Sequence, residues 1–99
     1  MAPSTPSIPP PTIHLNGTPA ADLLAQWENA YTALVDALAR LREVEVHGRD
    51  YPQGIDAARQ ARDGWEAHYT AIAGVTSDVG RVLSHLRADA RGVHADPTR

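Results

Sequence analysis

The chain has 99 residues, no cysteine and a formal net charge of −3 at pH 7. These values exclude a disulfide framework and a thiolate metal site, and they argue against a general nucleic-acid binder, which would carry a basic stripe. No apolar run is long enough to span a membrane, and the first residues lack the pattern of a signal peptide. We therefore expect a small protein of the bacterial cytoplasm, with neither membrane nor nucleic acid among its partners.

The N-terminal residues 1–12 (MAPSTPSIPPPT) contain five prolines and no charged side chain. Such a segment cannot form a helix and has little to bury, because proline lacks the backbone N–H and its neighbours are small or polar. We predict a flexible Pro-rich arm, which is either a disordered tail or an extended segment that docks onto a partner. Asn16-Gly17 after it predicts a turn.

The stretch 18–46 has the spacing of an amphipathic helix. Thr18 suits the N-cap, Pro19 the first helical position, and Gly48 the left-handed residue after the helix. The apolar residues recur at alternating steps of three and four, which places them on one helical face. These residues are Leu24, Trp27, Tyr31, Leu34, Leu38 and Leu41.

A link over 47–55 is predicted next, because Tyr51-Pro52-Gln53-Gly54 fits a type I turn with proline second and glycine fourth. The residue before a proline is also driven to extended geometry, so Tyr51 cannot continue the first helix.

A second helix is predicted at about 56–90, with Asp56 as a suitable N-cap. It has an apolar stripe that includes His68, for which we expect a buried, hydrogen-bonded imidazole. Three interior glycines each cost about 1 kcal/mol relative to alanine, which indicates close packing or a bend where they lie. The stripe comprises Trp65, His68, Ile72, Val75, Val79, Val82 and Leu86, and the glycines are Gly64, Gly74 and Gly80.

Two long helices with a short link form an antiparallel hairpin, which buries one side of each helix against the other. The apolar faces are wider than that arrangement needs, and so short a chain builds only a marginal core. The expected fold is therefore all-α: an antiparallel two-helix hairpin with an extended Pro-rich N-terminal arm, assembling with copies of itself into a helical-bundle oligomer. Residues 91–99 are expected to form a flexible tail.

The sequence contains no constellation that indicates catalysis. Ser84 and His85 are adjacent on a helix, where neighbouring side chains diverge by about 100°. There is no Gly-rich phosphate loop, and the His-Glu-x-x-His and Glu-x-x-His spacings of metal sites are lacking. We expect no enzyme, no metal and no cofactor.

The link carries side chains that suit a planar, phosphate-bearing ligand. Arg49 can bind phosphate in bidentate fashion, and Tyr51 offers a face for stacking. Asp50 and Gln53 can bind a base edge or a ribose hydroxyl. The alternative is an ordinary surface turn whose polar groups are solvated.

Ile13 to Thr18 (IHLNGT) and Gly48 to Gly54 (GRDYPQG) together resemble two motifs of a family of small proteins from tailed phages and prophages. The resemblance covers roughly residues 12–86. The family pattern has two tyrosines before the proline and an asparagine where this chain has His47. The resemblance implies a phage origin and no particular activity.

The two motifs lie at opposite ends of the predicted hairpin, because a helix over 18–46 is roughly 43 Å long. His14, Asn16 and Thr18 can therefore join the link residues in one ligand site only if two chains pack antiparallel. We favour a phage-encoded, non-enzymatic oligomer that sequesters a nucleotide-type host immune signal in the bacterial cytoplasm. The alternatives are a virion structural or assembly adaptor that docks through the proline arm, and a protein inhibitor of a host enzyme.

Overall fold

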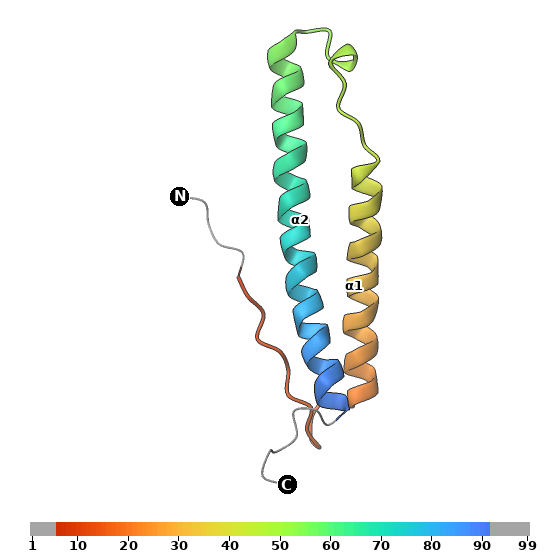
Figure 1. The fold of residues 1–99 in the computed structure, drawn as a ribbon. Helices are drawn as coiled ribbons and strands as arrows, with labels where there is room; N and C mark the ends of the chain where they lie inside the picture. The colour runs from red at the N-terminus through yellow and green to blue at the C-terminus, as the bar shows by residue number, and fades with distance from the viewer. Residues whose placement is uncertain (1–5, 92–99) are drawn as a thin grey trace.

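The computed structural model describes residues 6–91, which form two helices packed against each other as an antiparallel hairpin (Figure 1). Helix α1 spans Ala20–Arg42 and helix α2 spans Ile55–Ala90, with a short 3-10 helix, η1, at Gly48–Asp50 between them. At 1.5 Å per residue, α1 is about 35 Å long and α2 about 54 Å. The predicted helical hairpin is confirmed. No helix in the described range is long and apolar enough to cross a bilayer.

Helix α1 begins one residue later than the predicted cap requires. Pro19, with ψ at 143°, is the N-cap instead of the first helical residue, and its carbonyl accepts the N–H groups of Asp22 and Leu23 at 3.0 Å. The prediction that Thr18 caps the helix was wrong, since no side-chain cap hydrogen bond is formed. Proline fixes φ at a value that suits both helical and extended backbone. The residue type alone therefore does not say whether Pro19 is the N-cap or the first helical residue.

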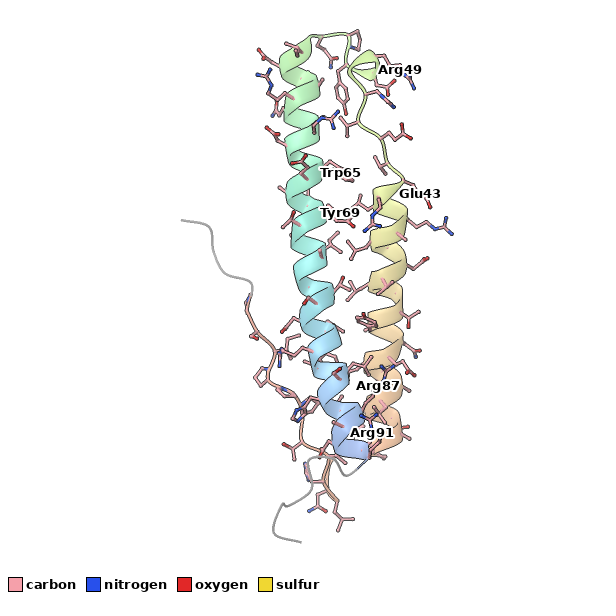
Figure 2. The ribbon with its side chains drawn as sticks, viewed as in Figure 1. Glu43, Arg49, Trp65, Tyr69, Arg87 and Arg91 are labelled. Atoms are coloured by element: carbon pink, nitrogen blue, oxygen red, sulfur yellow. The ribbon has the colours of Figure 1, made fainter. Side chains whose placement is uncertain are left out.

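Helix α1 ends at Arg42 and not near Val46, at the point where two side chains of α2 bind its last turn. The Trp65 indole Nε1 donates to the Leu41 carbonyl at 3.1 Å, and the Arg42 guanidinium donates to the Tyr69 hydroxyl at 2.6 Å. The Trp65 and Tyr69 rings stack with centroids 5.4 Å apart, and both side chains point from α2 toward α1 (Figure 2). The chain then continues without helical structure to η1.

The turn before α2 forms as predicted, because the Gly54 N–H donates to the Tyr51 carbonyl at 3.1 Å. Gly54 is the N-cap of α2, and its φ of 139° is open to glycine and strained for other residues. Asp56 lies in the first turn and is not the cap. Gly48 does not have the predicted left-handed conformation, because Gly54 alone among the described residues has a positive φ.

The buried core lies entirely in the C-terminal half of α2. Its members are Thr76, Val79, Val82, Leu83 and Leu86, whereas no residue of α1 is fully buried. The predicted apolar residues of α1 do face inward, but each is only half-buried. His68 is exposed, so the prediction of a buried imidazole was wrong. Within one chain, a two-helix hairpin covers each face only partly.

Residues 6–13 run beside the C-terminal half of α2 (Figure 1), where Asp78 and Arg81 hold the segment. The Ile8 N–H donates to the Asp78 carboxylate at 2.9 Å, and the Arg81 guanidinium donates to the Ile8 carbonyl at 2.5 Å. Val75 and Val82 are two turns apart on one face of α2. Val82 is 0% exposed and Val75 is 40% exposed. The depth of burial therefore differs between two valines that the apolar spacing places on the same face.

Docking of the arm is expected to weaken in acid. The Arg81 hydrogen bond, followed by the Ile8 N–H, lowers the pKa of Asp78 below its usual 3.8. A carboxyl with a lowered pKa stabilises the folded contact above its ordinary pKa, and this contribution is lost as the pH falls through the lowered value. Hydrogen exchange at the Ile8 amide should therefore be slow near neutral pH and lose its protection below about pH 4. The side chain introduced by Asp78→Asn still accepts the Ile8 N–H but does not titrate, so the same loss of protection in acid in that variant would contradict this assignment.

Candidate functional site

The tip of the hairpin is built by η1, the turn after it and the first turns of α2. The Asp50 N–H donates to the His47 carbonyl at 3.1 Å, and the Tyr51 N–H donates to the Gly48 carbonyl at 2.9 Å. With the turn that closes at Gly54, these backbone bonds fix the course of the link. The side chains of the predicted ligand residues are therefore not needed to hold the backbone in place.

Those predicted side chains have no partner among the residues that the structure describes. Arg49, Asp50 and Gln53 are exposed and Tyr51 is half-buried. Within residues 6–91, none of the four side chains makes a hydrogen bond or an ion pair. Figure 2 shows Arg49 at the outer edge of the tip, beyond the Trp65–Tyr69 pair. The tip thus offers a cation, an anion, an amide and an aromatic ring that a ligand can engage without breaking an existing contact.

A cavity of about 320 Å³ opens at the tip, and two arginines that sequence reasoning missed contribute to its wall. Arg62 donates to the Val46 carbonyl at 2.9 Å, which ties the link to α2, while Arg59 has no partner among the described residues. Ile55 is 73% exposed and supplies an apolar wall. The remaining lining residues are Gly48 and Ala58.

The sequence does contain a pattern that points to Arg59 and Arg62. Ile55, Arg59 and Arg62 are spaced by four and three residues, so they share one face of the first turns of α2. The turn at Tyr51–Gly54 places that face next to the link. Asp63 is four residues after Arg59, at the spacing of a helical ion pair, but no ion pair forms between them in this structure.

The other half of the predicted site lies at the opposite end of the molecule. The predicted Asn16-Gly17 turn is confirmed by a hydrogen bond from the Gly17 N–H to the His14 carbonyl at 3.1 Å. His14, Asn16 and Thr18 are exposed. They precede α1 at its N-terminal end, whereas the link follows its C-terminal end (Figure 1). A single chain therefore does not bring the two halves together.

A larger cavity, of about 490 Å³, lies between the helices near their other end. Its wall includes Tyr31, Gly80 and two arginines, but both cations are already bound. Arg87 is paired with Glu28 at 2.7 Å, and Arg81 is paired with Asp78 at 2.8 Å. An anionic ligand would have to displace these carboxylates, so the tip is the better candidate for an anion.

The link histidine does not form an acid–base pair with Glu43, with which it would share a helical face if α1 continued. Because α1 ends at Arg42, His47 instead bonds Glu45, with 2.6 Å between imidazole Nε2 and the carboxylate. No group of three or more metal-ligating side chains gathers within residues 6–91. Comparison with protein-family models, curated proteins and solved structures finds no match to this chain.

Proposed function

We propose that this chain is a non-enzymatic binding protein, encoded by a phage, that sequesters a nucleotide-type ligand at the tip of its hairpin. The observation that carries the proposal is the set of groups at the tip whose side chains have no partner within residues 6–91. Arg59 lines the tip cavity, and Arg49 and the half-buried Tyr51 lie in the link, which adjoins the cavity at Gly48. Guanidinium groups bind phosphate in bidentate fashion, and an aromatic face suits a base.

Self-association is the second part of the proposal. The inward face of α1 is only half-buried in one chain, and an added Cβ at Gly64 or Gly74 would meet no atom within 4 Å. Glycines inside a helix are unfavourable unless something approaches their backbone, and a second copy is the simplest partner. Antiparallel packing of two copies would also bring His14, Asn16 and Thr18 of one chain toward the link of the other.

Sequestration in the host cytoplasm, with a host immune signal as the ligand, is the biological setting we propose. The support is the resemblance of the two end motifs to those of small phage proteins. A sequestering protein also needs groups that bind and none that catalyse. The tip provides groups that can bind such a ligand.

A virion adaptor is the second candidate, and the arm is the feature that favours it. Residues 6–9 are exposed and rich in proline, which suits docking into an aromatic-lined groove of another protein. The backbone of Ile8 is, however, already bound by α2. Recovery of the chain with virion proteins, and with no nucleotide, would support the adaptor.

The test of nucleotide binding is calorimetric titration with cyclic dinucleotides, ADP-ribose and inorganic phosphate. Arg49→Ala and Arg59→Ala should each weaken binding of the tightest ligand about tenfold, which is the lower range for a hydrogen bond to a charged group because both sites are exposed. Circular dichroism and sedimentation should be unchanged, since neither side chain holds the backbone.

Asp63→Asn is the comparison variant, because it removes a negative charge one helical turn from Arg59 and leaves the Arg59 guanidinium in place. It should strengthen phosphate binding. Wild-type protein that binds none of these compounds, or Arg49→Ala and Arg59→Ala variants that bind as the wild type does, would refute the proposed function.

A further inference from the structure

Asp78 and Arg81, one helical turn apart on α2, bind both polar backbone groups of a single residue. The Asp78 carboxylate accepts the Ile8 N–H at 2.9 Å and the Ser7 hydroxyl at 3.3 Å. The Arg81 guanidinium donates to the Ile8 carbonyl, and it also bonds the Asp78 carboxylate at 2.8 Å. An adjacent β-strand would satisfy the same N–H and C=O groups of an extended chain. We refer to this pair as the backbone clamp.

The backbone clamp recognises an extended main chain more than any particular side chain. All four of its hydrogen bonds to the described part of the arm reach backbone atoms or the small Ser7 hydroxyl, and Ile8 stays 37% exposed. Beside the clamp is a cavity of about 240 Å³, lined in part by Pro6 and Gly74. The contacts would be the same for the arm of any copy of this chain.

The connection between the arm and α1 is a turn with little backbone hydrogen bonding. It contains one backbone hydrogen bond, from the Gly17 N–H to the His14 carbonyl, before the helix begins. Rotation at this turn moves the arm without breaking a helical bond. Because prolines remove N–H donors and prevent the arm from folding on itself, its docking depends on the surface that it meets.

We propose that the backbone clamp binds the arm of a second copy of this chain, so that neighbouring subunits exchange arms. Exchange of an identical element keeps every native contact and is a low-cost route to association. This inference rests on the proposed self-association and adds the segment that links the subunits.

The test uses the absence of cysteine from the chain. Pro6→Cys and Gly74→Cys place one thiol on each side of the cavity beside the clamp, and Gly74 has open space for a side chain. The two single variants, one isotopically labelled, are mixed after mild denaturation and refolding and treated with a short bis-maleimide. A crosslink between one labelled and one unlabelled chain, joining Cys at the two different positions, requires an arm of one copy on α2 of another.

The expected result is a heterodimeric crosslink as the main product, reduced about tenfold when Arg81→Ala removes the bond to the Ile8 carbonyl. A chain with both cysteines is the control that shows whether the bis-maleimide can span positions 6 and 74 within one chain. Crosslinking within that double variant, with none between the single variants, overturns arm exchange. If sedimentation still shows an oligomer in that case, self-association stands and only the exchange is refuted. A monomer in sedimentation refutes both.

Discussion

Replacing Leu83 or Leu86 by alanine is expected to lower the free energy of unfolding by about 2–5 kcal/mol for each substitution. Leu83 is 2% exposed and Leu86 is 0% exposed, and they belong to a core of only five buried residues within the described range. Each substitution removes the transfer energy of the lost methyl groups and leaves a cavity in a hairpin with little material to fill it. Urea denaturation followed by circular dichroism measures the change.

Leu15→Ala is the control, because Leu15 is 97% exposed and should contribute almost nothing. Leu34→Ala gives a second comparison, since Leu34 is half-buried in one chain. The loss in free energy of unfolding caused by Leu34→Ala should approach the loss caused by Leu83→Ala only if another copy covers α1. Equal stability of the Leu83→Ala, Leu86→Ala and wild-type proteins would show that the core is misplaced.

The hairpin was predictable from the sequence because its apolar residues keep the helical period over two long stretches. Periodicity identifies the face of a helix that turns inward, but it does not say how deeply each residue is buried. Val75 and Val82 have the same side chain and the same face, yet only Val82 is covered. Docking of the arm was also not predictable, because its contacts with Asp78 and Arg81 join residues about seventy positions apart.

The end of α1 was not predictable for a similar reason. The local sequence offers Gly48 as a stop signal, whereas the helix ends at Arg42, where Trp65 of α2 binds the Leu41 carbonyl. A contact between residues so distant in the chain leaves no local pattern. The turn at Tyr51–Gly54 was predictable because proline and glycine determine it within four residues.

The candidate site was predictable in part. Reading the link as one segment identified Arg49 and Tyr51, but it excluded the arginines of the helix that follows. Arg59 and Arg62 line the tip cavity because the turn places the first turns of α2 beside Gly48, whereas Arg49 and Tyr51 are not among its lining residues. The residues around His14 were assigned to the site through the resemblance of motifs, and the structure places them at the other end of α1.

In a single hairpin, Gly80→Ala is expected to be less stable than Gly64→Ala. A Cβ at Gly80 would lie 2.8 Å from Cε1 of the Tyr31 ring, whereas a Cβ at Gly64 would meet no atom within 4 Å. Both positions are interior to α2, so the gain of about 1 kcal/mol in helix propensity is common to both substitutions and cancels in their difference. The contact with Tyr31 should therefore make Gly80→Ala less stable than Gly64→Ala by about 1–3 kcal/mol, the usual range for overpacking.

The same pair of variants separates a lone hairpin from an assembled one. If nothing packs on Gly64, Gly64→Ala raises the midpoint of thermal unfolding at every protein concentration. If a second copy packs against that backbone, the added methyl group instead weakens the oligomer, and sedimentation shows a larger fraction of monomer at micromolar concentration.

The double variant Gly80→Ala/Tyr31→Leu removes the ring that the new methyl group would meet, so it should recover part of the stability lost in Gly80→Ala. Failure of that rescue would show that the Tyr31 ring is not the group the new methyl meets.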